Sequence, residues 1–138
     1  MIVRRVRLDD LPQLVPLMVE AHRAYRMQIP YTRSLKQFTE AMGNVATITL
    51  VADLMDLNQP VPEKKLVGFV WGEVQETGDF FIHHVYGRGR IGPQLWEAIE
   101  KEAKAAGCRR VTGLTSRPMG FVHKYGARIQ QYFVVKEI

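Results

Sequence analysis

A loop rich in glycine and arginine connects an apolar segment to an amphipathic helix. Its sequence is Gly87-Arg88-Gly89-Arg90-Ile91-Gly92. Glycines let a backbone approach an anion closely, and the free N–H groups and positive macrodipole end of a following helix attract negative charge. With two arginines added, the pattern predicts a phosphate-binding site. A tight strand-to-helix turn with solvated arginines has the same pattern and stays open as the alternative.

Three side chains that can accept a proton precede this loop. Glu73 lies in an apolar segment at residues 66–74, where alternation places it with Trp71 on the face opposite Val70. A carboxylate there is suited to general base catalysis, although a solvent-facing strand residue follows the same pattern. His83 and His84 are adjacent on the next predicted strand. Alternation places them on opposite faces, which argues against joint metal binding but leaves either imidazole as an alternative base.

The helix after the loop is the most strongly marked element. Apolar residues recur at helical spacing from Ile91 to Ala106, and Glu and Lys occupy the other face. Pro93 suits the first turn and Gly107 suits the C-terminal cap. The helix is therefore predicted to begin at the loop itself.

The other elements follow from hydrophobic periodicity and turn-forming residues. Asp9 or Asp10 is a suitable N-cap for a first helix, in which Pro16 requires a bend or a later start. Residues 53–65, with two prolines and several charges, predict an exposed, mobile connection. The predicted strands span residues 2–8, 47–52, 66–74, 80–86, 109–115 and 129–135, with a hairpin turn at 76–79, and the predicted helices span residues 10–25, 34–43, 91–106 and 119–125.

Composition and charge restrict the class of protein. At 138 residues, 46% of them hydrophobic, the chain suits one globular domain. It has no apolar run long enough to cross a bilayer and no signal-peptide core, so a cytoplasmic protein is expected. The lone Cys108 excludes an internal disulfide and is interpreted as a core residue. Residues 87–128 hold nine basic and three acidic side chains, which favours a polyanionic ligand, with nucleic acid or a merely solvated face as alternatives.

The order of elements, β-α-α-β-β-β-α-β-α-β, resembles that of the GCN5-related N-acetyltransferase (GNAT) family over nearly the whole chain. The second half carries the most specific part of the resemblance: the strand end Val85-Tyr86, the loop, the long helix, the next strand, and Phe121-Val122-His123-Lys124-Tyr125-Gly126-Ala127. That last stretch is similar to the family's Phe-Tyr-x-x-x-Gly-Phe. The resemblance implies an α/β GNAT fold, a single mixed central sheet flanked by helices, forming one acyl-CoA-binding domain over residues 1–138.

The resemblance implies acetyl-CoA (coenzyme A) as acyl donor, with pyrophosphate on the loop amides and pantetheine along the strand end at residues 83–86. The family's loop reads Gln/Arg-x-x-Gly-x-Gly/Ala. Here Gly87 stands at the Gln/Arg position and Arg90 at the first glycine, so only Gly92 matches strictly. Arg88 and Arg90 are expected to compensate through contacts to phosphate worth about 1.5–3 kcal/mol each. The implied cofactor-binding residues are His84, Val85, Tyr86, Gly87, Arg88, Gly89, Arg90, Ile91, Gly92 and Phe121.

The implied reaction moves an acetyl group from acetyl-CoA to an amine of a small molecule or protein. Glu73 is the first candidate for the base, because several family members carry a glutamate on this strand. Val122 replaces the tyrosine that serves the family as acid, so Tyr125 or His123 would have to protonate the leaving thiolate. The implied catalytic residues are Glu73, His83 and Tyr125.

Two functions of different class stay open. The intact strand, loop and helix with Glu73 favour an acetyltransferase. Val122 and Arg90 favour a GNAT-like domain that has kept the fold but serves in binding or structure, as in short members encoded by bacteriophages. Nucleic-acid binding is a weaker third reading. No metal site and no membrane partner are expected, a homodimer is left open, and the acceptor is expected to bind near residues 25–43.

Overall fold

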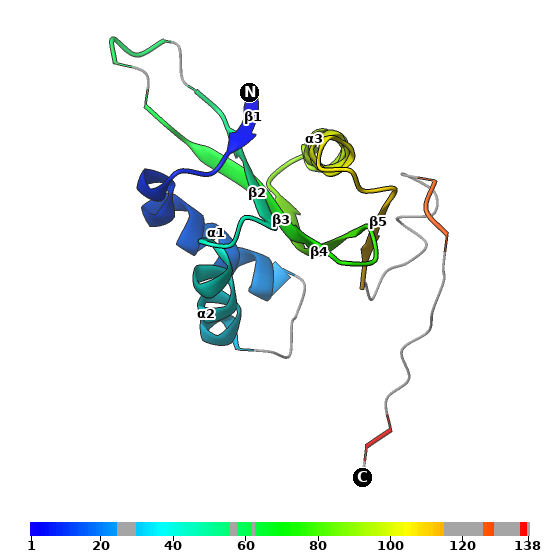
Figure 1. Cartoon of the computed structure of the whole chain (residues 1–138). Coiled ribbons are helices and arrows are strands. Elements are labelled where there is room, and N and C mark those ends of the chain that lie inside the picture. Colours follow the sequence, from blue (N-terminus) through cyan, green and yellow to red (C-terminus); the bar gives the residue numbers. More distant parts are fainter. Residues whose placement is uncertain (25–29, 56–57, 62, 115–125, 129–135, 138) are drawn as a thin grey trace.

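The computed structural model describes residues 1–24, 30–55, 58–61, 63–114, 126–128 and 136–137 (Figure 1). Within them one mixed sheet has the strand order β1-β2-β3-β4-β5, with α1 and α2 on one face and α3 on the other. The strands are β1 (Ile2–Arg5), β2 (Thr47–Asp53), β3 (Leu66–Val74), β4 (Asp79–Gly87) and β5 (Arg110–Gly113), and the helices are α1 (Leu11–Ala24), α2 (Tyr31–Ala41) and α3 (Gly92–Ala105), with a 3₁₀ turn η1 (Leu8–Asp10) before α1. The predicted α/β class with a single mixed sheet is confirmed.

The sheet is antiparallel from β1 to β4, whereas β4 and β5 are parallel. Two shifts in register interrupt it. In β3 the partner of Ala52 is Gly68 and the partner of Asp53 is Leu66, so Val67 is an extra residue. In β4 the partner of Trp71 is His84 and the partner of Gly72 is Ile82, which makes His83 the extra residue. A β-bulge of this kind bends the strand and re-aims its side chains.

Each face of the sheet has its own apolar core. Leu95, Ile99 and Ala103 of α3 pack on one face, and Leu14, Leu17, Met18 and Ala21 of α1 pack with Phe38 of α2 on the other. These residues recur at helical spacing along each helix, which is why the periodicity of the sequence predicts the helices well. Among the described residues no helix has the length and apolar character needed to cross a bilayer.

The boundaries of several elements differ from the sequence predictions. α2 begins at Tyr31, three residues before the predicted start at residue 34. Pro16 lies inside α1, where it is exposed, so water can reach the backbone that this proline leaves without a hydrogen bond. Asp10 does not cap α1, because it is the last residue of η1 and its carboxylate accepts the backbone N–H of Arg7 at 2.7 Å. The predicted helix at 119–125 and strand at 129–135 lie outside the described residues.

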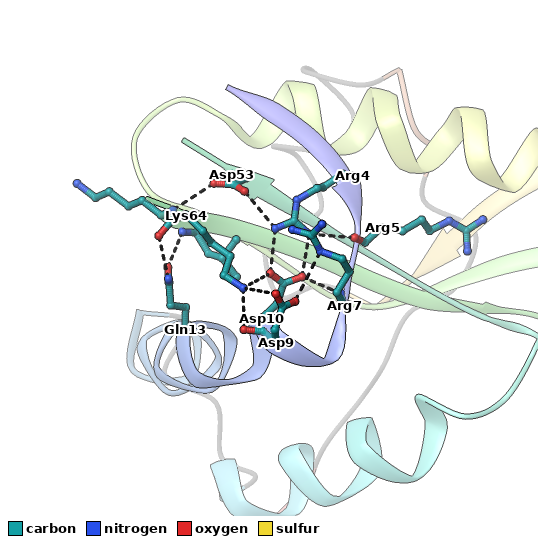
Figure 2. A network of polar contacts seen from close by, with 10 residues as sticks. Arg4, Arg5, Arg7, Asp9, Asp10, Gln13, Asp53 and Lys64 are labelled. Atoms are coloured by element: carbon teal, nitrogen blue, oxygen red, sulfur yellow. Dashed lines mark hydrogen bonds and ion pairs between the residues drawn. The ribbon is translucent and has the colours of Figure 1, made fainter. Parts of the chain in front are cut away.

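A buried polar network replaces part of the exposed connection predicted at residues 53–65 (Figure 2). Arg4 donates two hydrogen bonds to the Asp10 carboxylate, at 2.8 and 2.9 Å, and a third to Asp53 at 3.1 Å. Lys64 lies 3.2 Å from Asp10 Oδ1. Asp53 ends β2 and is 4% exposed, so the first residue of the predicted loop belongs to the sheet. The network ties β1, η1 and both ends of the β2–β3 connection together.

Candidate active site

The bulge in β4 places both adjacent histidines on the face of the sheet that α1 and α2 cover. Ile82 and Val85 pack against the core under α3, whereas the rings of His83 and His84 both stack on Trp71. The prediction that the two imidazoles point to opposite faces is therefore wrong. Strict alternation holds only for a strand without an extra residue, and His83 is that residue.

The same bulge brings His83 to Glu73 on the neighbouring strand. His83 Nε2 lies 2.9 Å from Glu73 Oε1, and the two side chains are 17% and 38% exposed. A carboxylate only accepts hydrogen bonds, so Nε2 carries the hydrogen and Nδ1 of the neutral ring is left with a lone pair. Nδ1 makes no hydrogen bond to a described residue. The pair thus has the geometry of a base oriented by a carboxylate.

The second imidazole has a different environment. His84 stacks on His22 of α1 with ring centroids 5.4 Å apart. His22 Nδ1 donates to the Met18 carbonyl at 2.9 Å, and its Nε2 lies 2.8 Å from the Ser34 hydroxyl of α2. Burial, helped by the neighbouring His22 and His83, lowers the pKa of His84 to about 4. His84 is therefore neutral at pH 7 and is suited to packing and hydrogen bonding rather than to carrying charge.

His22 and Ser34 were not among the predicted site residues, and both are buried. The sequence held a signal for His22, because it lies four and eight residues after Met18 and Leu14 on the apolar stripe of α1. A polar residue on such a stripe needs a buried partner. Its partner lies across the connection between two helices, which local periodicity does not reveal.

The predicted phosphate loop is only partly built as expected. Gly87 is the last residue of β4, and a Cβ there would collide with the side chain of Ile91, so this glycine serves the packing of α3 on the sheet. Gly89 has φ +69 and open space around its Cβ position. α3 begins without a side-chain cap, so its first N–H groups remain available to an anion.

The two loop arginines have different surroundings. Arg88 donates from Nε to Glu20 of α1 at 2.8 Å, and its backbone N–H donates to the Val67 carbonyl at 2.8 Å. The hydrogen bond from Arg88, aided by one from Tyr86, holds the pKa of Glu20 below its ordinary value. Arg90 is exposed and forms no ion pair with a described residue. Of these two arginines, Arg90 is therefore the one whose charge no described acidic side chain neutralises.

Several predicted residues are not tested by this geometry. Tyr125 and Phe121, together with Val122 and His123, lie outside the described residues. Of the expected acceptor region, Phe38 is 2% exposed and packs in the core rather than lining a pocket. Among the described residues no group of three or more His, Cys, Asp or Glu side chains is arranged to hold a metal ion.

No family model matches the sequence, and no curated protein matches it. Solved structures do match. The aminoglycoside antibiotic 6'-N-acetyltransferase AAC(6')-IG from Acinetobacter haemolyticus has a TM-score of 0.72 at 11% identity, covering 100% of this chain and 98% of that chain. AAC(6')-Iy in complex with the bisubstrate analogue CoA-S-monomethyl-acetylneamine has a TM-score of 0.70 at 14% identity, covering 99% of this chain and 97% of that chain.

A third similar structure is the ribosomal-protein-alanine N-acetyltransferase from Brucella melitensis biovar Abortus 2308. Its TM-score is 0.69 at 16% identity, covering 99% of this chain and 100% of that chain. These likenesses extend over the full length of each protein, and at such identities they speak for the fold. The chain has the fold of the GCN5-related N-acetyltransferases, as the order of its elements and the motifs of its second half predicted.

Proposed function

We propose that this chain is an N-acetyltransferase that moves an acetyl group from acetyl-CoA to an amine. The observation that carries the proposal is the His83–Glu73 pair, held at 2.9 Å on the β4 bulge, where the ladder between β4 and β5 ends at Ile82. His83 lies on the strand that ends at Gly87, the first residue of the Gly/Arg loop. A base on the strand that leads into an anion-binding helix start suits attack of an amine on the thioester of a nucleotide-linked acyl donor.

In this mechanism His83 is the base and Glu73 positions it. Nδ1 of His83 takes a proton from the ammonium group of the acceptor, and the amine then attacks the thioester carbonyl. Glu73 fixes the tautomer and balances the charge of the imidazolium. The proton on Nδ1 passes to water after the transfer, which restores the neutral ring with its hydrogen on Nε2. As the amide forms, the nitrogen loses its remaining extra proton to water and the sulfur leaves as a thiolate. Tyr125 is the proposed proton donor to this thiolate, and it regains a proton from water.

The loop fits the diphosphate of acetyl-CoA in part. The left-handed conformation and open surroundings of Gly89, the uncapped start of α3 and the exposed Arg90 all suit an anion. The ion pair with Glu20 makes Arg88 a weaker contributor than the sequence suggested. The proposal also includes a single domain over residues 1–138, a cytoplasmic location, and an acceptor amine that belongs to a small molecule or a protein.

Calorimetry with acetyl-CoA and with coenzyme A tests the donor site first. Arg90→Glu should weaken binding about tenfold or more, because it removes a charge-assisted contact worth about 1.5–3 kcal/mol and adds a repulsion. Lys104→Glu, at the opposite end of the same helix, makes the same change in net charge and should leave affinity within about twofold. No heat and no thermal shift at millimolar acetyl-CoA would reject the donor assignment and leave a GNAT-like binding domain.

Kinetics with a panel of amines tests the base. His83→Gln should lower kcat by about 10²–10⁴-fold while the KM for acetyl-CoA stays nearly constant, because only the proton transfer is lost. Glu73→Gln should cost less than His83→Gln, since the amide oxygen still accepts from Nε2. The opposite order of effects would make Glu73 the base. A stable protein that binds acetyl-CoA but acetylates no amine would favour the binding or structural role.

A further inference from the structure

The indole of Trp71 lies directly against the imidazole of His83. Trp71 is 1% exposed and is among the largest fully buried side chains of the described residues. Its ring centroid is 4.4 Å from that of His83, with the two planes inclined by 17°. The ring of Phe38 from α2 meets the indole in an edge contact at 5.3 Å and 68°. The indole of Trp71 thus lies between Phe38 of α2 and the imidazole of His83.

The contact follows from the strand register rather than from chance proximity. Trp71 is the cross-strand partner of His84, and His83 is the extra residue beside that pair. The His84 ring also lies nearly parallel to the indole, at 6.3 Å and 4°. Side chains that lie opposite each other on paired strands pack together, and this packing restricts their orientation. Packing alone orients the indole, because its Nε1 is buried without a hydrogen-bond partner among the described residues.

His83 is therefore held in two directions at once. Glu73 accepts its Nε2–H in the plane of the ring, and Trp71 covers one face of the ring. A carboxylate alone would leave the imidazole free to rotate about this hydrogen bond, whereas the stacked indole, with the Phe81 ring in an edge contact at 5.0 Å and 72°, restricts the plane of the imidazole. The charged and titratable groups that face His83 are Glu73 on β3 and His84 on β4, with His22 of α1 behind His84.

We propose that Trp71 is a positioning residue for His83: the indole fixes the plane of the imidazole so that Nδ1 is held toward the acceptor amine while Nε2 stays on Glu73. The catalytic part of this inference rests on the proposed acetyl transfer. The geometric part, a His83 ring immobilised on an indole, does not. The two parts have separate measurements, so failure of one is distinguishable from failure of the other.

The test compares Trp71→Leu and Trp71→Phe with Phe69→Leu. Phe69 is a matched control, because it lies on the same strand, is 0% exposed in the same core and contacts Tyr86 rather than His83. Trp71→Leu should lower kcat by about 10²-fold at nearly constant KM for acetyl-CoA, as expected for a misplaced base. Trp71→Phe should recover most of the rate, and Phe69→Leu should keep kcat within about threefold.

Nuclear magnetic resonance of the His83 ring decides the geometric part, whether or not acetyl transfer is detected. Protons stacked on an indole are shifted upfield by its ring current. The His83 signals, assigned with His83→Gln, should be shifted upfield in the natural protein and in Phe69→Leu, and should move toward ordinary histidine values in Trp71→Leu. Ordinary His83 shifts in the natural protein would overturn the proposal. So would equal losses of kcat in Trp71→Leu and Phe69→Leu.

Discussion

Acidification from pH 7 to pH 4 should destabilise the fold through His84. Burial beside His22 and His83 lowers the pKa of this imidazole to about 4, from an ordinary value of 6.5. Between these two values the unfolded chain binds a proton at this position that the folded chain does not. Stability therefore rises with pH across the window, and the contribution present at pH 7 is lost as the pH falls toward 4.

The size of the effect follows from the shift. A depression of this extent corresponds to about 3 kcal/mol when the window has been crossed, and to about 2 kcal/mol by pH 5. Domains of this kind are stable by about 5–15 kcal/mol in total, so the loss is a large share of the margin. At a typical urea dependence of about 1–3 kcal/mol per molar, a loss of 2 kcal/mol moves the urea midpoint by about 1 M.

Urea denaturation at a series of pH values and constant ionic strength measures the loss. The informative variant is His84→Phe, which keeps an aromatic ring in the stack with His22 and Trp71 but has no proton to gain. Between pH 7 and pH 4.5 the natural protein should lose about 2–3 kcal/mol more than the variant loses. Equal losses in the two proteins would show that His84 titrates normally in the folded state, and the reasoning from burial would be wrong.

Two further substitutions test the parts of the fold that carry the site. Asp10→Asn should lower the free energy of unfolding by about 3–5 kcal/mol, because Arg4 loses the buried carboxylate that accepts two of its hydrogen bonds and keeps only Asp53. Asp9→Asn, with a side chain 69% exposed, should change it by no more than about 0.5 kcal/mol. Similar small costs for both would mean that the network contributes little. Gly72→Ala should lower the free energy of unfolding by about 1–3 kcal/mol or more, because its Cβ would collide with the β4 backbone at Phe81. It should also shift the magnetic resonance signals of the His83 ring. Gly43→Ala is the control, because a Cβ at Gly43 has open space around it. A fully stable Gly72→Ala would contradict the close approach of the two strands.

The amphipathic helix shows what the sequence can predict. The structure places α3 at Gly92–Ala105, within one residue of the predicted 91–106. Gly107 has φ +88 just after the helix, as a C-terminal cap requires. These features depend on residues three or four positions apart, so a short stretch of sequence is enough to predict them. The strands around the site were predicted to within one residue for the same reason, since their apolar runs and turn residues are local.

The orientation of the histidines could not be predicted in this way. It depends on a bulge, and the bulge depends on how β3 and β4 meet. The chain does hold one signal, Gly72, because an isolated glycine within a strand suggests a bulge or a close backbone approach. The structure gives both reasons, since the register shifts between Trp71 and Gly72 and any Cβ at Gly72 would meet the backbone of β4. The signal indicates that something interrupts the ladder, but not which residue becomes the extra one.

The network around Asp10 was missed for a different reason. Its ion pairs join Arg4 to Asp53 across 49 residues and Lys64 to Asp9, whose backbone carbonyl Lys64 also binds, across 55 residues (Figure 2). No local pattern distinguishes these charged side chains from others on the surface. Only the pairing of β1 with β2, which puts Ile2 opposite Asp53, brings the partners together. The expectation of an exposed connection failed at its two ends, where Asp53 and Lys64 are bound.

Arg90 is the residue at which the loop departs from the family's motif, and it is also the residue proposed to compensate for that departure. Arg90 stands where the family has its first glycine, so backbone approach is restricted there. The flexible position has moved to Gly89, which has the positive φ and the open surroundings. Arg88 is engaged by Glu20 and Val67, which leaves Arg90 as the exposed loop cation beside the uncapped start of α3. In the proposed donor site, Gly89 would therefore give an anion access to the backbone, and Arg90, which forms no ion pair with a described residue, would supply charge. This is why Arg90, rather than Arg88, is the residue whose reversal should decide whether the loop binds acetyl-CoA.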